Sequence, residues 1–265
     1  MNRQEFEMIE LLKKLKNEYG VIEIKAEFEA EGSRIEELMR LKDVSSYVNL
    51  PIILKIGGAE AVTDIYNGII LGVNGLIAPM VETPYAVSKY LDVIDKLIQP
   101  DNRDFIDFAI NIETVTALEN IEKIFSLEKI NLLNSITFGR SDFVQSMGFS
   151  KFEVNSDVVY QHVKKVATLA QEKNLKFAMG GNVTKNSIEF IRNLYNENLI
   201  HKYETRKVVF ESSFIENNPE NGLELALEFE LMWLKSKRRF YSKIKEEDEQ
   251  RIIDLENRMN IWIGL

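Results

Sequence analysis

Two acidic residues stand in the turns that end short, strand-like apolar runs. Glu113 follows the run 108–112, Asp142 follows the run 135–138, and a helical segment separates them. In a parallel α/β barrel the carboxyl ends of neighbouring strands meet at one rim, so both carboxylates would project into one pocket. Two carboxylates, water and a bidentate keto acid complete an octahedron around Mg²⁺ or Mn²⁺. The alternative is that each acid only caps the helix that follows it.

A second group of charged residues precedes this pair. Lys25, Glu27 and Glu29 recur at every second position of the expected strand 21–28, so they share one face of it. Charges on the inward face of a barrel strand are costly unless they line the polar mouth. Glu27 and Glu29 are therefore candidates for acid–base work or a third metal contact. Lys55 lies near the end of the next expected strand, 52–56.

Three stretches resemble the metal-site motifs of the HpcH/HpaI aldolase and citrate lyase β-subunit family. They are Ile112-Glu113-Thr114, Gly139-Arg140-Ser141-Asp142 and Met147-Gly148, and 78–83 resembles the strand-end turn of that family. The resemblance covers about 21–207 and implies a pyruvate/phosphoenolpyruvate-type barrel in which Glu113 and Asp142 bind Mg²⁺ or Mn²⁺. It further implies a carbon–carbon lyase or aldolase that acts, through a metal-stabilised enolate, on a 2-oxo acid such as pyruvate or oxaloacetate, or on an acyl-CoA substrate.

The sequence departs from that family at two places. Lys55 stands where the family has an arginine that grips the substrate carboxylate; a lysine keeps the charge but loses the planar fork, which Arg34, Arg140 or Arg206 could supply instead. The loop 30–34 lacks the family's histidine, so Glu27, Glu29 or a metal-bound water must replace it as the base. The predicted residues are as follows: catalytic Glu27, Glu29, Lys55 and Arg140; substrate-binding Lys55, Arg34, Gly139 and Ser141; metal-binding Glu113 and Asp142. The competing hypothesis is a barrel without lyase chemistry that serves as a binding or assembly subunit.

The alternation of strands and helices predicts one TIM-type (β/α) barrel over 1–265. Seven strands are expected where a closed barrel of this type has eight, and the missing one is the first, so either the barrel is open there or another segment fills the gap. An N-terminal helix precedes it, and a helical extension, 219–265, follows in two pieces, about 219–244 and 246–259. A doubly wound open sheet is the alternative fold, but no glycine-rich dinucleotide fingerprint supports it.

Composition limits the partners. The net charge of -9 opposes binding to nucleic acid or to an anionic membrane, and no segment has the roughly 20 apolar residues of a membrane span. The chain contains no cysteine, which fits a cytoplasmic protein. The two histidines, His162 and His201, are expected to be structural.

The carboxyl-terminal helices carry more apolar residues than a peripheral helix needs for its own packing. Leu223, Leu227, Leu231 and Leu234 form a stripe, which Phe229, Met232 and Trp233 widen, and a second segment adds Ile252, Ile253, Leu255, Met259, Ile261 and Trp262. This predicts a homo-oligomer, and the resemblance implies a trimer or hexamer. The alternative is that these helices cover the open edge of their own barrel.

Overall fold

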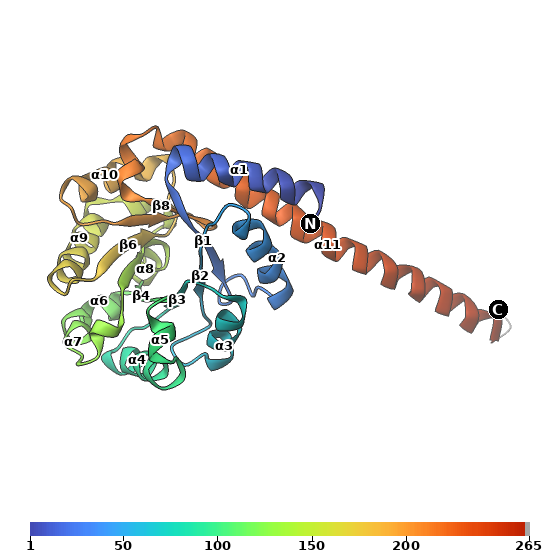
Figure 1. The fold of residues 1–265 in the computed structure, drawn as a ribbon, viewed down its shortest axis with the longest axis horizontal. Coiled ribbons are helices and arrows are strands. Elements are labelled where there is room, and N and C mark those ends of the chain that lie inside the picture. Colours follow the sequence, from blue (N-terminus) through green and yellow to red (C-terminus); the bar gives the residue numbers. More distant parts are fainter. Residues whose placement is uncertain (263–265) are drawn as a thin grey trace.

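The computed structural model describes residues 1–262 and the side chains of residues 1–259. Eight strands close into one barrel in chain order, with helices around its outside (Figure 1). The strands are β1 (Val21–Glu27), β2 (Ile52–Lys55), β3 (Gly75–Ala78), β4 (Asp107–Ile112), β5 (Ser135–Gly139), β6 (Lys176–Gly180), β7 (Lys202–Glu204) and β8 (Val208–Glu211). The α-helices are α1 (Arg3–Tyr19), α2 (Ile35–Ser46), α3 (Val62–Leu71), α4 (Pro84–Leu97), α5 (Pro100–Arg103), α6 (Val115–Glu119), α7 (Ile121–Phe125), α8 (Arg140–Ser146), α9 (Asp157–Glu172), α10 (Ile188–Asn196) and α11 (Pro219–Trp262). The expected (β/α) barrel is confirmed.

The eighth strand, which the seven expected strands lack, comes from a hairpin at the end of the barrel. The segment 203–210, expected to be the single last strand, is two strands, β7 and β8. The chain reverses at 205–207, where the Thr205 hydroxyl accepts a hydrogen bond from the Val208 amide at 3.2 Å. Strand β8 therefore runs antiparallel to β7 and also to β1, with Ile24 paired to Val208. The barrel is closed by this reversed strand, and no additional first strand is required.

The barrel carries two kinds of interior. Alternate residues of the strands point outward and join the large apolar core under the helices, as Leu54, Leu76 and Ile110 do. Inside the barrel a small apolar layer, formed by Ile53, Ile77, Ala109 and Val209, fills the middle. Above this layer the inward residues become charged or polar, which leaves a polar mouth at the carboxyl ends of the parallel strands.

Helix α11 is one continuous helix, so the expected break near residue 245 is wrong. Ion pairs from Lys243 to Glu246 (3.5 Å) and from Lys245 to Glu249 (3.2 Å) span that point, and neither glycine nor proline interrupts it. At 44 residues the helix is about 66 Å long. Its second half projects from the body as a single rod (Figure 1).

The first half of α11 packs on the body beside α1. Leu223, Ala226, Phe229 and Trp233 are buried there, so this half does cover its own barrel. The last anchors are near Tyr241, whose hydroxyl donates to a Glu37 carboxylate oxygen at 2.7 Å. From residue 243 to residue 259 every described side chain is exposed. None of the described helices is long and apolar enough to cross a membrane.

Candidate active site

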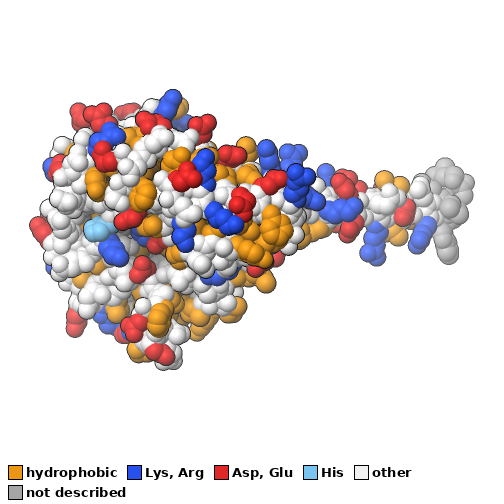
Figure 2. Space-filling view, turned by 45° about the horizontal axis from the view of Figure 1, so that its top comes forward, with side chains coloured by type: hydrophobic (Ala, Val, Ile, Leu, Met, Phe, Trp, Pro, Cys, Tyr) orange, Lys and Arg blue, Asp and Glu red, His pale blue; other side chains and the backbone are white. Residues whose placement is uncertain are grey.

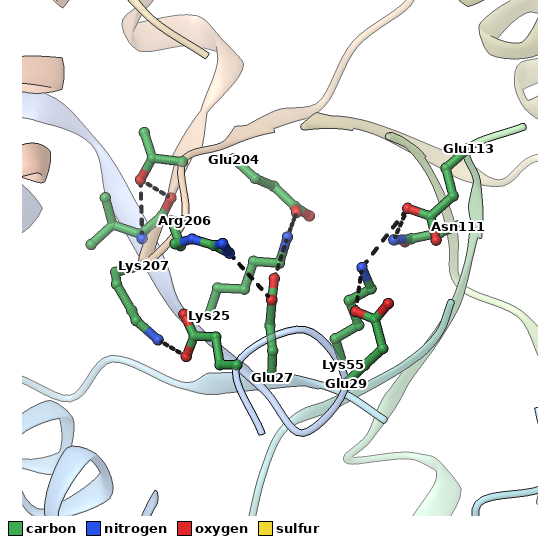
Figure 3. A network of polar contacts seen from close by, with 12 residues as sticks. Lys25, Glu27, Glu29, Lys55, Asn111, Glu113, Glu204, Arg206 and Lys207 are labelled. Atoms are coloured by element: carbon green, nitrogen blue, oxygen red, sulfur yellow. Dashed lines mark hydrogen bonds and ion pairs between the residues drawn. The ribbon is translucent and has the colours of Figure 1, made fainter. Parts of the chain in front are cut away.

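A cavity of about 630 Å³ opens at the carboxyl ends of the parallel strands. Its wall combines residues from β1, β2, β4, β5 and β6 with the β7–β8 hairpin, the first turn of α8 and two residues of α11, Leu227 and Glu230. The charged side chains of its mouth point toward one another from opposite sides of the barrel (Figure 3). The strand ends therefore deliver acids and bases to one enclosed space.

Glu113, the first residue after β4, is held in a fixed position. One carboxylate oxygen accepts a hydrogen bond from the Met80 amide (2.9 Å), and the other accepts from Asn111 Nδ2 (3.1 Å). The space that it occupies exists because Gly139 has no side chain: a Cβ there would lie 2.6 Å from Glu113 Oε2 and 2.8 Å from Glu113 Cβ. A glycine is therefore needed at position 139 to make room for the Glu113 side chain, and not only to form the turn.

Asp142 lies in the first turn of α8 and lines the same cavity. Burial raises the pKa of Glu113 above its ordinary value, Lys55, Met80 and Asn111 oppose that rise, and the charge of Asp142 adds to it. The two predicted metal ligands therefore line one cavity, close enough for the charge of Asp142 to act on Glu113. A buried and a half-buried carboxylate that repel each other suit a cation between them.

The oxygen donors at this point fit a hard divalent ion. Besides the two carboxylates, Asn111 Oδ1 is buried and has no hydrogen-bond partner in the described part of the chain. Across residues 1–262 no group of three or more His, Asp or Glu side chains is placed to hold a metal. The other ligands of such an ion would have to be water or substrate.

Lys55 enters the cavity from the end of β2 and is buried. Its ammonium lies 3.0 Å from Glu29 Oε2 and 3.8 Å from Glu113 Oε2. Lys55 therefore lies beside the Glu113 carboxylate and is partly neutralised by Glu29. Glu29, predicted to be catalytic, contacts Lys55 but does not itself line the cavity.

A second charged cluster occupies the β1 and β7 side of the mouth. Lys25 Nζ lies 2.8 Å from Glu204 Oε2 and 3.4 Å from Glu27 Oε1, and Arg206 Nη1 lies 3.8 Å from Glu27 Oε2 (Figure 3). Burial acts to raise the pKa of Glu27, but Lys25, Lys55 and Arg206 outweigh it and hold the pKa low. Burial likewise opposes the charge of Lys25, yet Glu204 and Glu27 raise its pKa. Glu27 is therefore an ionised, buried carboxylate facing the cavity.

Two further predicted substrate-binding residues lie in the cavity wall. Gly139 and Ser141 both line it, at the junction of β5 and α8. Gly181 packs against this junction with a φ of +82°, and a Cβ there would lie 2.4 Å from the Ser141 amide nitrogen. The close approach of the two backbones sets the position of Ser141.

Arg140 does not point into the cavity. Its guanidinium is fully buried and donates to the carbonyls of Gly180 (3.2 Å), Gly181 (3.0 Å) and Val154 (3.3 Å), and also to Asn155 and Ser187. It also lies over the ring of Phe190 at 4.9 Å. Its donors are used inside the protein, so Arg140 ties the end of β6 to α8 and is not placed to contact substrate.

Arg34 and the two histidines also lie away from the mouth. Arg34 is exposed at the start of α2 and stacks on Tyr241 of α11 at 5.1 Å, and it does not line the cavity. His162 packs edge-on against Phe143, and His201 accepts a hydrogen bond from the Phe177 amide at 3.1 Å. Both histidines are outside the cavity wall.

Sequence reasoning left several wall residues without a role. Asn111 sits two residues before Glu113, so strand alternation could have placed it on the same inward face. Glu204 belongs to a charged cluster whose position in a strand is visible in the sequence but whose function is not. Glu230 comes from α11, and no sequence signal places that helix over the mouth.

The chain matches the family model described as HpcH/HpaI aldolase/citrate lyase over residues 33–192. No curated protein matches its sequence. Solved structures share the fold at low identity. Citrate Synthase SbnG is 18% identical with a TM-score of 0.58, covering 73% of this chain and 89% of that one. An HpcH/HpaI aldolase from Desulfitobacterium hafniense DCB-2 is 15% identical with a TM-score of 0.54, covering 73% and 88%. A protein of the HpcH/Hpal aldolase/citrate lyase family from Burkholderia cenocepacia J2315 is 11% identical with a TM-score of 0.53, covering 71% and 89%.

Proposed function

Because this chain belongs to the HpcH/HpaI aldolase/citrate lyase family, we propose that it is a divalent-metal-dependent carbon–carbon lyase or aldolase. The substrate class is a 2-oxo acid of the pyruvate or oxaloacetate kind, or a related acyl-CoA. The observation that supports this most is the convergence of Glu113 and Asp142, from neighbouring strand ends, on one cavity.

Mg²⁺ or Mn²⁺ would be held by Glu113 and Asp142. When bound, the ion supplies Lewis-acid stabilisation of negative charge on a substrate oxygen. Asn111 and the Met80 amide orient Glu113 through its two oxygens, which is the kind of support that fixes a ligating carboxylate. The Gly139 position leaves room for that orientation.

Lys55 is the proposed partner of the substrate carboxylate. Its ammonium faces the cavity beside Glu113, so an anion bound at the metal site would lie within its reach. A lysine binds as a point charge without the fork of an arginine, and Glu29 already shares its charge. Lys55 therefore fixes the position of the carboxylate less strictly than an arginine would.

Glu27 is the proposed base. It is buried in the cavity wall, and its pKa is held low by Lys25, Lys55 and Arg206, so it is ionised at neutral pH. In a retro-aldol cleavage Glu27 accepts the proton of the substrate hydroxyl, the carbon–carbon bond breaks, and the bonding electron pair moves onto the carbonyl oxygen of the 2-oxo acid. Arg206, which bridges Glu27 and Glu230, keeps the carboxylate at the mouth.

Calorimetric titration with Mn²⁺, with and without pyruvate or oxaloacetate, tests the metal site. Glu113→Gln and Asp142→Asn should each abolish Mn²⁺ binding while leaving the melting temperature nearly unchanged. Glu119→Gln, at an exposed position outside the cavity, is the matched control and should bind Mn²⁺ normally. Unchanged binding in both site variants would refute the assignment.

The role of Lys55 is tested by affinity. Lys55→Ala should raise the apparent binding constant for oxaloacetate far more than it lowers the melting temperature, whereas Lys173→Ala, at an exposed site, should do neither. An equal loss of stability and affinity would mark Lys55 as structural.

A second candidate function is a barrel that has lost lyase chemistry and acts as a binding or assembly subunit. The pairing of Lys55 with Glu29 and the absence of a histidine from the cavity wall favour it. The titration separates the two candidates, since a subunit of this kind would bind neither Mn²⁺ nor the 2-oxo acid. In either case we propose a homo-oligomer, a trimer or hexamer, because the projecting half of α11 exposes apolar side chains.

A further inference from the structure

Helix α11 carries a strict heptad stripe on its exposed face. From Leu227 onward, residues spaced alternately by four and three are Leu227, Leu231, Leu234, Arg238, Tyr241, Lys245, Asp248, Ile252, Leu255 and Met259. All are exposed except Tyr241, which is half-buried. This stripe is separate from the buried face that packs α11 on the body, which includes Phe229 and Trp233. Apart from Tyr241, which contacts Glu37 and Arg34 on the body, the repeat is exposed, and an exposed seven-residue repeat is typical of a coiled-coil seam.

The stripe is apolar at both ends and charged in the middle. The first three positions are leucines, and the last three are Ile252, Leu255 and Met259. Arg238, Lys245 and Asp248 lie between these two apolar groups. The middle of the helix also divides by the sign of its charges. Residues 235–245 include six Lys or Arg and no acid, and residues 246–256 include six Asp or Glu and one Arg. The succession of charges with apolar side chains between them is visible along the projecting helix (Figure 2).

We propose that the exposed stripe of α11 pairs with the same stripe of a second copy of this chain, antiparallel, about a two-fold axis between residues 246 and 247. In this register Lys245 faces the partner's Asp248, and Tyr241 faces the partner's Ile252. Leu234 likewise faces the partner's Met259. Basic and acidic halves then lie against each other, and a charged central pair fixes the register.

The competing parallel arrangement brings like charges together. In a parallel pair Lys245 would face the partner's Lys245, and Asp248 would face the partner's Asp248, with the basic halves side by side. Like charges in contact are destabilising. A parallel pair would also give Lys245 and Asp248 no partner of opposite sign on the facing helix, so the sequence favours the antiparallel pair.

The length of the helix fits this arrangement. The overlap extends over about 231–262, roughly 48 Å at the rise of an α-helix. The end of the partner's α11 then reaches to within about one turn of Leu227, which lines the cavity mouth. A two-fold pair closes as a dimer, or as three such dimers in a hexamer, so of the two predicted assemblies it is compatible with the hexamer and not with a bare trimer.

The absence of native cysteines makes a disulfide test specific. Leu234→Cys and Met259→Cys are prepared as separate proteins, then oxidised alone and after mixing. The antiparallel register predicts a cross-linked dimer only in the mixture, because each position lies far from its own copy and next to the other. Self-linking of either variant alone would show a parallel pair, and no link in the mixture would overturn the proposal.

A charge swap tests the same register without cysteine. Lys245→Glu should weaken the pair about tenfold, because both symmetric contacts become repulsive, and adding Asp248→Lys should restore it. Light scattering measures the outcome as a mass relative to the 30.7 kDa of one chain. Failure of the second substitution to restore assembly, or a one-chain mass for the unmodified protein at every concentration, would refute the proposal. Neither measurement depends on enzymatic activity.

Discussion

Replacement of Gly139 by alanine tests how the barrel positions Glu113. The new Cβ would lie 2.6 Å from Glu113 Oε2, whereas ordinary van der Waals contact begins near 3.4 Å, so one of the two groups has to move by about 0.8 Å. Glu113 is pinned by the Met80 amide and Asn111, and Gly139 is part of β5, so neither side yields freely. The strain should appear both in stability and in the orientation of the carboxylate.

The expected magnitude follows from overpacking. Inserting one methyl group into a packed site costs about 1–3 kcal/mol, which for a chain of this size lowers the melting temperature by roughly 2–10 °C. Displacing a metal ligand through its neighbours weakens metal affinity by about 10–100-fold. Gly139→Ala should therefore melt earlier and bind Mn²⁺ less tightly than the unmodified protein.

Thermal unfolding and Mn²⁺ titration measure the two effects separately. Gly58→Ala is the matched control, because a Cβ at Gly58 meets nothing within 4 Å and should change neither quantity. An unchanged melting temperature would refute the packing argument. A lower melting temperature with unchanged Mn²⁺ affinity would instead refute the assignment of Glu113 as a metal ligand.

Three other substitutions probe buried charges. Arg140→Lys should lower the free energy of unfolding by at least about 3 kcal/mol in urea titration, because a lysine cannot make all the buried hydrogen bonds of Arg140; a loss below about 1 kcal/mol would contradict this. Lys25→Met should lower the free energy of unfolding by about 3–5 kcal/mol at neutral pH, because it leaves buried carboxylates without a positive partner. Adding Glu204→Gln should recover part of that loss, and a double variant whose loss equals the sum of the two single losses would show no coupling. Burial acts to raise the pKa of Glu37, but hydrogen bonds from Tyr241 and Lys237 outweigh it and hold the pKa below its ordinary value. The stabilisation is therefore present above the pKa of the unfolded chain and is lost as the pH falls through the folded pKa. The difference in melting temperature between the unmodified protein and Glu37→Gln should accordingly shrink in acid, and a constant difference would be evidence against the linkage.

Much of the fold follows from patterns along the chain. Alternating strands and helices predict the barrel, and because acids follow two neighbouring strands, Glu113 and Asp142 were expected on one cavity wall, where the structure places them. The reversal at Thr205 was missed because the residues on both sides of the turn favour strands, and the turn itself contains neither glycine nor proline. The antiparallel pairing of β8 with both β7 and β1 shows that the chain has turned back.

Other errors arise from side-chain direction and context. Arg140 follows a strand end, so the sequence predicts that its side chain points into the cavity. In the structure its guanidinium instead donates hydrogen bonds to the Gly180 and Gly181 carbonyls inside the protein. The chain around Lys245 is rich in residues that favour a helix and is supported by exposed ion pairs, but these residues give no apolar periodicity from which continuity could be predicted. The position of Glu230 at the mouth depends on how α11 docks, which no local pattern specifies.

The reversed strand β8 has a consequence for how this barrel can diversify. Long loops at the carboxyl ends of barrel strands are where insertions are tolerated and where new specificities arise. Between β7 and β8 the rim is only the short turn 205–207. The Thr205 amide donates a hydrogen bond to the Val208 carbonyl, the Thr205 hydroxyl accepts one from the Val208 amide, and Lys207 forms an ion pair with Glu31. Lengthening this turn would disrupt those contacts, whereas the loops after the other strands of the rim carry no such constraint from a hairpin.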